Sequence, residues 1–212
     1  MKDKRTIGCI LMAAGTSERF EYGNKLMADL GGKPVISYPV RTLLSVKGMF
    51  DQAEEGIALD LLAVTRWPEV REVCLAAGIP CFLYEGGLQS DTIRVGLEAA
   101  EDRNWEGCMF LAGDQPLVTA GTVKRLIETF AARPDQPCRA AWQGNAANPV
   151  IFPSACFGAL KKLQGDEGGR QVLRNMKTAI SLAEVEDVSE LVDIDTLQDY
   201  QQMIRTILER QH

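Results

Sequence analysis

Two cations follow a short apolar run near the start of the chain, in the stretch ILMAAGTSERFEYGNK at residues 10–25. Three small residues come first and would let a ligand approach the backbone closely. They are Ala13, Ala14 and Gly15. Arg19 and Lys25 follow, and arginine can hold phosphate oxygens bidentately while lysine supplies a mobile point charge. The pattern indicates a buried strand and then a loop that grips a polyphosphate, although an ordinary strand-to-helix turn with solvated charges would also fit.

Two familiar phosphate-binding loops do not match this stretch. A P-loop requires G-x-x-x-x-G-K-[ST], but Asn24 separates Gly23 from Lys25, and Leu26 stands where the metal-binding hydroxyl is needed. A dinucleotide fingerprint requires G-x-G-x-x-G, but Gly15 is followed by no other glycine until Gly23. A phosphate site here must therefore be of another kind.

Asp114 lies in a Gly-Asp-Gln-Pro sequence directly after the apolar run at residues 107–112, which predicts a central strand. Ligands of open parallel sheets bind beyond the carboxyl ends of the strands, so we expect Asp114 at the same edge as the opening loop. A carboxylate there would suit Mg²⁺, which takes one or two carboxylates and fills its other positions with phosphate oxygens and water. The alternative is a turn that only ends the strand.

A second acidic sequence, DIDT at residues 193–196, precedes the last predicted helix. Asp195 with Gln198 three residues later fits a capping box, in which side chains satisfy the first backbone N–H groups of the helix. This interpretation competes with a metal-binding role for Asp193 or Asp195. The local sequence favours capping.

Two glycine-containing stretches are open to two interpretations each. The GDEGGR sequence at residues 165–170 would form either an anion-binding nest, with Arg170 adding charge, or an exposed turn between helices. In GGLQSDT at residues 86–92, Ser90 or Asp91 would cap the following helix, or the loop would hydrogen-bond the edge of a nucleobase. Capping is the simpler expectation for this second stretch.

Composition limits the classes of protein that fit. At 212 residues, with 46% hydrophobic and 25% charged residues, the chain suits one globular domain over residues 1–212. No apolar run is long enough to span a bilayer, and the opening residues lack a convincing cleavage region, so we expect a cytoplasmic protein without a membrane partner. The net charge of −6 argues against nucleic-acid binding, which calls for a basic face.

Cysteine and histidine usage excludes further chemistry. Six cysteines are scattered without C-x-x-C pairs, which indicates buried reduced thiols rather than a metal centre or a disulfide framework. They are Cys9, Cys74, Cys81, Cys108, Cys138 and Cys156. The single histidine, His212, ends the chain, so a histidine base or a Ser-His-Asp triad is not expected.

Strand-like and helix-like segments alternate along the chain. The patterns predict strands at residues 6–12, 58–65, 80–84, 107–112, 138–142, 149–152 and 178–184, with an extended piece at 191–194. They predict helices at residues 34–46, 68–77, 90–103, 119–132, 153–163 and 168–176 and from residue 196 onward, with a loop at 47–57. This alternation implies crossover connections and hence a three-layer, Rossmann-like α/β fold, a mainly parallel twisted sheet with helices on both faces.

The order of the short motifs carries a resemblance. LMAAGTSERF and NK are followed by QSDTIRVGL, GDQPLV, NPVIF, GDEGGR and DIDT, from Ile10 to about Tyr200. This series resembles the MobA-like nucleotidyltransferases, and within them the molybdenum cofactor cytidylyltransferase (MocA-like) group. The Ala-Ala pair before Gly15 is similar to the CTP-using branch, because the guanylyl-transferring relatives usually carry Gly-Gly there.

The resemblance implies an activity and a nucleotide-diphospho-sugar transferase type of fold. The activity is Mg²⁺-dependent transfer of CMP from CTP to molybdenum-bound molybdopterin with release of pyrophosphate, with a molybdenum hydroxylase apoenzyme as possible recipient. Alternatives are transfer of GMP, transfer of a nucleotide to a sugar phosphate, a pyridine-nucleotide-dependent reductase of related sequence, or a non-catalytic molybdopterin carrier.

The resemblance also implies site residues in three groups. The nucleotide would contact Ala13, Ala14, Gly15, Arg19, Lys25, Ser90 and Asp114, of which Arg19, Lys25 and Asp114 would also be catalytic. Mg²⁺ would bind Asp114, with Asp195 as a second candidate. The pterin substrate would face Asn148, Pro149, Gly165, Asp166, Glu167, Gly168 and Arg170. The chain departs from the family pattern at Glu21 and Tyr22 in the opening loop, at Asp91 and Thr92 after Ser90, and at Ala147.

Overall fold

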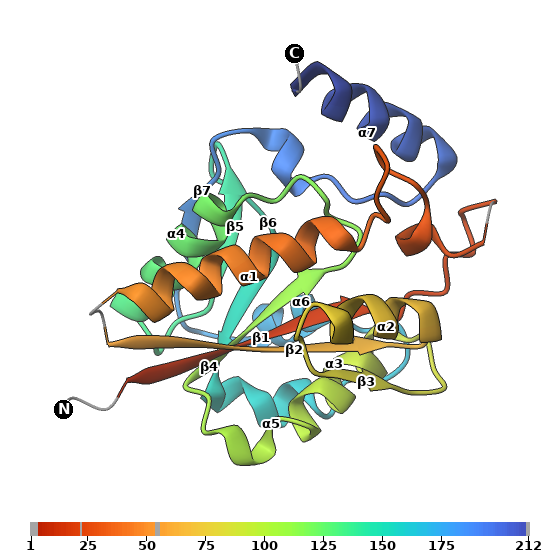
Figure 1. The fold of residues 1–212 in the computed structure, drawn as a ribbon. Helices are drawn as coiled ribbons and strands as arrows, with labels where there is room; N and C mark the ends of the chain where they lie inside the picture. Colours follow the sequence, from red (N-terminus) through yellow and green to blue (C-terminus); the bar gives the residue numbers. More distant parts are fainter. Residues whose placement is uncertain (1–3, 22, 54–55, 211–212) are drawn as a thin grey trace.

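The computed structural model describes residues 4–21, 23–53 and 56–210, and a seven-stranded sheet runs through this part of the chain (Figure 1). The strand order is β3-β2-β1-β4-β6-β5-β7. Of these strands β6 alone runs against the others, because it is antiparallel to both β4 and β5. The mainly parallel α/β sheet is therefore confirmed. The strands are β1 (Arg5–Ala13), β2 (Ile57–Thr65), β3 (Cys81–Leu83), β4 (Gly107–Ala112), β5 (Cys138–Trp142), β6 (Asn145–Pro153) and β7 (Ser181–Glu184).

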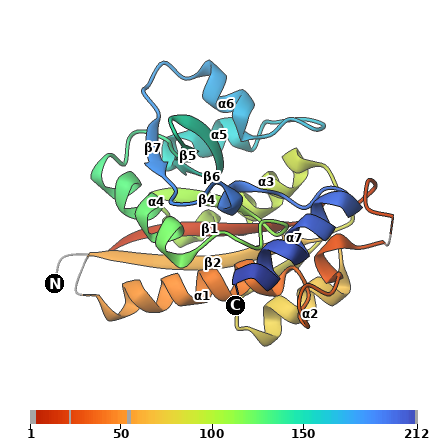
Figure 2. The same ribbon diagram turned by 90° about the horizontal axis from the view of Figure 1, so that it is seen from above.

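Helices cover both faces of the sheet (Figure 2). They are α1 (Ser37–Gln52), α2 (Pro68–Ala76), α3 (Gln89–Glu98), α4 (Ala120–Ala132), α5 (Phe157–Leu160), α6 (Gly169–Asn175) and α7 (Leu197–Arg210). One buried cluster joins the sheet to α1, α2, α4 and α7, and a second joins the opposite face to α3, α5 and α6. Two apolar layers on either side of one sheet account for the three-layer arrangement.

The strand β1 lies inside the sheet, between β2 and β4, and contributes to both apolar layers. Ile7 and Cys9 belong to one buried cluster and Ile10 to the other, as expected when successive side chains point to opposite faces. At Gly8 a Cβ atom would lie 2.0 Å from Cε3 of Trp105, so the close approach of this indole ring requires glycine. Tight packing of β1 on both faces therefore fixes the point at which the following loop begins.

The structure corrects two predictions at the first helix. Pro34 does not begin the helix but pairs with Asp29 in an isolated bridge, and the helix starts at Ser37. The predicted loop at residues 47–57 begins too early, because α1 continues to Gln52. The buried residues Val46 and Phe50 extend its apolar stripe at helical spacing, and burial of this stripe outweighs the glycine at position 48.

Other differences concern the ends of elements. The predicted helix at residues 90–103 ends at Glu98 and continues as a 3₁₀ turn at Glu101–Arg103, and the one at 153–163 shortens to a 3₁₀ turn and α5. The predicted strand at 149–152 is longer and spans Asn145–Pro153. All six cysteines are buried and free, as predicted. His212 and Tyr22 lie outside the described residues.

Candidate active site

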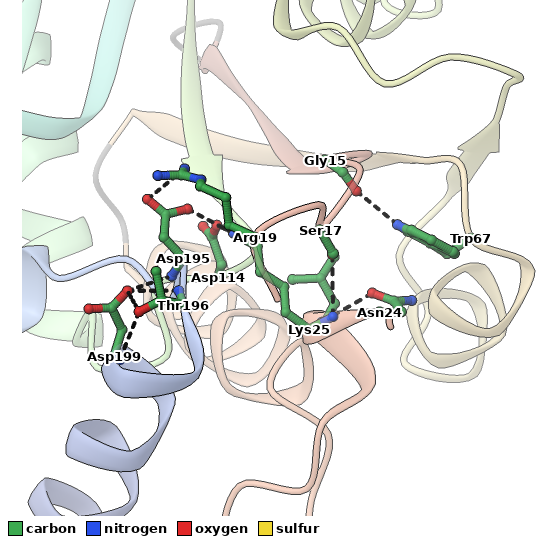
Figure 3. A network of polar contacts seen from close by, with 11 residues as sticks. Gly15, Ser17, Arg19, Asn24, Lys25, Trp67, Asp114, Asp195, Thr196 and Asp199 are labelled. Carbon is green, nitrogen blue, oxygen red and sulfur yellow. Dashed lines mark hydrogen bonds and ion pairs between the residues drawn. The ribbon is translucent and has the colours of Figure 1, made fainter. Parts of the chain in front are cut away.

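The loop after β1 is hydrogen-bonded at two points to the start of helix α2, and Figure 3 shows the bond made by Trp67. The indole Nε1 of Trp67 donates to the carbonyl oxygen of Gly15 at 3.1 Å, and the side-chain amide of Asn24 donates to Glu69 at 2.9 Å. Asn24 also accepts from the backbone N–H of Leu26 at 3.1 Å, which caps the 3₁₀ turn Lys25–Met27. These bonds position Lys25 at the carboxyl end of the sheet.

Lys25 joins two aspartates that are far apart in the sequence. Its Nζ lies 2.5 Å from Oδ2 of Asp114 and 3.1 Å from Oδ1 of Asp195, and Arg19 Nη2 lies 3.0 Å from Oδ2 of Asp195 (Figure 3). The Lys25 side chain is 10% exposed, whereas that of Arg19 is 71% exposed. Burial would lower the pKa of Lys25, but the two carboxylates outweigh it and raise this pKa, so the ammonium form is kept.

Asp195 reaches this position because the segment before α7 is held beside β4. The backbone N–H of Ile194 donates to the carbonyl oxygen of Asp114 at 3.0 Å. The ring of Tyr200 packs edge-on against Phe20 at 5.7 Å between centroids, which brings α7 against the opening loop. A turn near the end of the chain thus completes the site.

The cap of α7 differs from the prediction by one residue. Asp199 accepts hydrogen bonds from the backbone N–H groups of Asp195 and Thr196, at 3.2 and 2.8 Å, and its own N–H donates to the Thr196 hydroxyl at 3.2 Å. The capping box therefore pairs Thr196 with Asp199, and the predicted pairing of Asp195 with Gln198 is wrong. Capping does not use the carboxylate of Asp195, which turns to Arg19 and Lys25 instead.

Removing this cap is expected to disturb both helix and site. For Asp199→Ala we expect the free energy of unfolding to fall by about 1 kcal/mol, the usual cost of losing a cap. Urea unfolding measures it, with Asp51→Ala as control, because Asp51 makes only an exposed pair with Lys47 within α1. Equal unfolding midpoints for the two variants would contradict the assigned cap.

The carboxylates of Asp114 and Asp195 fit a magnesium ion. Both contact the same Lys25 nitrogen, so their oxygens already surround one point, and two carboxylates completed by phosphate oxygens and water match the preference of Mg²⁺. Among the described residues no group of three or more His, Cys, Asp and Glu side chains is arranged to hold a metal, so substrate oxygens would have to complete the shell. The pKa of the neighbouring Asp193 is raised to about 7. The causes are desolvation of its carboxyl group and the negative charges of Asp114 and Asp195.

A cavity of about 810 Å³ opens beside Asp114, on the face of the sheet covered by α3 and α6. Its floor is formed by β1, β4 and β6, and its walls by the loops before α3 and α6. Eight predicted site residues line it: Ala14, Gly15, Asp114, Asn148, Asp166, Glu167, Gly168 and Arg170. A Cβ atom at Gly168 would lie 2.3 Å from Oε1 of Gln89, another lining residue, so a larger residue there would force this flexible side chain to move.

Other predicted residues do not line this cavity. Arg19 and Lys25 lie at the carboxylate pair, and Ala13 ends β1, where its carbonyl oxygen accepts from the Thr65 hydroxyl at 2.8 Å. Gly165 accepts from the Ser90 hydroxyl at 2.6 Å. This bond ties the loop before α6 to the first turn of α3.

The expected roles of two of these stretches change. Ser90 and Asp91 do not cap α3, because the N-cap residue is Leu88 and Ser90 lies buried within the first turn of the helix. Asn148 and Pro149, expected to face the pterin substrate, lie within β6; Asn148 lines the cavity, whereas Pro149 is buried and does not line it. Glu21, one of the residues that depart from the family pattern, is exposed and does not line the cavity.

Sequence reasoning missed two arginines of the cavity, Arg139 and Arg174. A signal existed for each. Arg139 is the single charged residue in the apolar strand β5, and Arg174 follows Arg170 by four residues, which places both on one face of a helix.

Comparison with known proteins identifies the family. A family model described as the MobA-like NTP transferase domain matches residues 9–181. The chain belongs to this family. The resemblance of the motifs is thereby confirmed. The strands β2 to β6, the loop after β1 and Asp114 lie within the matched range, whereas Asp195 lies beyond its end.

Two curated relatives are similar to the chain in sequence, and one solved structure is similar to it in fold. The purine catabolism protein PucB of Bacillus subtilis (strain 168) is 29% identical over 219 residues, covering 98% of this chain and 100% of PucB. The 2-C-methyl-D-erythritol 4-phosphate cytidylyltransferase of Dehalococcoides mccartyi (strain CBDB1) is 27% identical over 128 residues, covering 58% and 52% of the two chains. The structure of Rv0371C in complex with manganese, from Mycobacterium tuberculosis H37Rv, has a TM-score of 0.72 at 20% identity, covering 96% and 100%.

This MobA-like chain therefore has the α/β fold of nucleotidyltransferases, and it also superposes with a TM-score of 0.76 at 20% identity on a nucleotidyl transferase from Methanothermobacter, covering 96% of this chain and 98% of that one. Within the described ranges, no helix combines the length and the apolar character needed to cross a bilayer.

Proposed function

We propose that this MobA-like protein transfers CMP from CTP to the terminal phosphate of molybdenum-bound molybdopterin and releases pyrophosphate, with Mg²⁺ as cofactor. The observation that carries the proposal is the convergence of Lys25 and Arg19 on Asp114 and Asp195 beside a cavity lined by Ala14 and Gly15. The cytidylyltransferase among the relatives and the manganese complex among the structures support a CTP-type substrate and a divalent metal.

The chemistry needs no general base. A phosphate monoester has a second pKa of about 6 and is largely dianionic at neutral pH, so the acceptor is already a nucleophile. Its oxygen would attack the α-phosphorus of CTP, a new P–O bond would form, and the bond to the β-phosphate would break as pyrophosphate leaves. Residues 4–210 contain no histidine, which is consistent with this reaction.

The protein must instead position two anions and reduce their repulsion. Asp114 and Asp195 would hold Mg²⁺, which when bound neutralises charge on the phosphate oxygens. Lys25 and Arg19 would then exchange their carboxylate partners for phosphate oxygens. Asn148 and the loop at residues 166–170 would contact the pterin substrate, and a molybdenum hydroxylase apoenzyme would receive the product.

A nucleotide panel tests the proposal. We expect CTP with Mg²⁺ to raise the melting temperature more than GTP, ATP or UTP, because a ligand that binds only the folded state stabilises it by mass action, about 2.7 kcal/mol at a concentration of 100 Kd. Thermal unfolding with and without EDTA measures the effect. Stabilisation by GTP in preference to CTP would replace CMP transfer by GMP transfer.

A turnover assay separates the remaining alternatives. Release of pyrophosphate from CTP only when molybdenum-bound molybdopterin is present supports the proposal, and release with a sugar phosphate instead would change the acceptor. Binding of the pterin without any turnover of CTP would indicate a carrier. Oxidation of NAD(P)H would indicate the reductase.

A further inference from the structure

Three arginines meet at the end of the cavity that is formed by β5 and α6. Arg139 comes from β5, and Arg170 and Arg174 lie one turn apart on α6, so all three line the same space. We refer to Arg139, Arg170 and Arg174 as the arginine cluster. The arginine cluster and the loop after β1 lie at opposite ends of the cavity, because the strands β4 and β6 separate β5 from β1.

The arginine cluster lacks the carboxylate partners that the other site cations have. Across residues 4–21, 23–53 and 56–210, none of the three arginines has a carboxylate oxygen within 4.0 Å, whereas Lys25 and Arg19 are both paired. The acidic residues Asp166 and Glu167 also line the cavity without pairing with the cluster. The Glu167 carboxylate accepts from the backbone of Gln164 at 3.0 Å instead.

The position of Arg139 is set by the sheet. It pairs with Val150 of β6, which pairs with Phe110 of β4, and residues directly opposite one another share a face, so all three line the cavity. Its Nε donates to the carbonyl oxygen of Ala147 at 3.1 Å and fixes the guanidinium plane. Its two Nη nitrogens make no hydrogen bond to any described residue.

Electrostatics makes this arrangement costly without a ligand. Burial and the charge of Arg170 lower the pKa of Arg139, because a half-buried cation is placed beside a like charge. The chain as a whole carries a net charge of −6, so a generally basic composition does not explain why three arginines lie together. Arginine side chains with free N–H groups recognise oxyanions by paired hydrogen bonds.

We propose that the arginine cluster binds a second anionic group of the acceptor, an oxyanion distinct from the phosphate that attacks CTP. The identity of the acceptor rests on the proposed function, whereas the anion site does not. Neighbouring strands lie about 4.8 Å apart, so β5 lies about 14 Å from β1. A nucleotide whose phosphates lie at Lys25 and Arg19 would leave the cluster to the other substrate.

The first experiment uses inorganic phosphate as the probe, so it does not depend on activity. Thermal unfolding is measured in phosphate and in chloride of equal ionic strength, for wild type, Arg139→Gln and Arg174→Gln. We expect the phosphate-specific rise in melting temperature to be lost in both variants. It should persist in Arg205→Gln, a control on the exposed side of α7, and in Arg19→Gln.

Arg174→Gln protects this test against a folding artefact, because Arg174 is exposed and makes no ion pair within the described part of the chain, whereas Arg139 bonds to Ala147. An unchanged phosphate response in Arg174→Gln and Arg139→Gln overturns the proposal. Loss of the response in Arg19→Gln alone, which would place the phosphate at the nucleotide cations, overturns it too.

The second experiment uses CTP, Mg²⁺ and molybdenum-bound molybdopterin. We expect the KM for the acceptor to rise at least about tenfold in Arg139→Gln and Arg174→Gln, with partial recovery in Arg139→Lys and with the Kd of CTP changed by less than about twofold. Weaker binding of CTP, with an unchanged KM for the acceptor, would overturn the assignment of the cluster to the acceptor. If wild type shows no CMP transfer at all, the proposed function fails while the phosphate experiment still decides the anion site.

Discussion

Asp114→Asn is expected to abolish nucleotidyl transfer while leaving the fold intact. Asparagine keeps the shape of the side chain and one oxygen acceptor, but it removes the charge that would hold Mg²⁺ beside the phosphates. Losing one preorganised electrostatic group at a reaction centre usually costs about a hundredfold to a thousandfold in turnover, and we expect a loss at the upper end because the metal would be lost with it. Initial rates of pyrophosphate release at saturating CTP and Mg²⁺ measure the effect.

The fold should survive this substitution, because Lys25 keeps Asp195 as a partner 3.1 Å away and the Asp114 carbonyl still accepts from Ile194. Asp135→Asn, at an exposed position outside the cavity, is the matched control. Turnover of Asp114→Asn near the wild-type rate would show that this carboxylate does not hold the metal.

Lys25→Met is expected to abolish turnover and to weaken the fold. The substitution preserves most of the side-chain volume but leaves Asp114 and Asp195 facing each other without the cation between them. Removing one partner of a buried ion pair costs about 3–5 kcal/mol, and because the Asp195 side chain is 38% exposed we expect about 2–3 kcal/mol. Urea unfolding measures this loss, with Lys47→Met as control, because the Lys47 pair with Asp51 is exposed and worth little.

Magnesium should distinguish a metal site from a purely structural ion pair. In wild type the ammonium of Lys25 occupies the space between the two carboxylates, whereas in Lys25→Met that space is open to a cation. We therefore expect Mg²⁺ to raise the unfolding midpoint of Lys25→Met by more than that of wild type. The same response in both proteins would argue that Asp114 and Asp195 do not form a metal pair.

Local patterns were sufficient for most of the scaffold. Apolar runs bounded by glycine and proline predicted the strands β1, β2 and β4, and the strand–helix alternation predicted a mainly parallel sheet. From these, Asp114 could be expected at the same edge as the opening loop, because the carboxyl ends of parallel strands share one edge of a sheet. These inferences succeed because backbone periodicity and chain direction are local properties.

Local sequence patterns could not predict which charged side chains pair with one another. Lys25 and Asp195 are separated by 170 residues, and nothing in either neighbourhood states that they meet. The DIDT sequence favoured capping by Asp195, yet Thr196 and Asp199 form the cap. Arg139, Arg170 and Arg174 likewise converge only through the pairing of β5 with β6 and the docking of α6. An ionic interaction depends on the distance between side chains, and packing of elements remote in the sequence sets that distance.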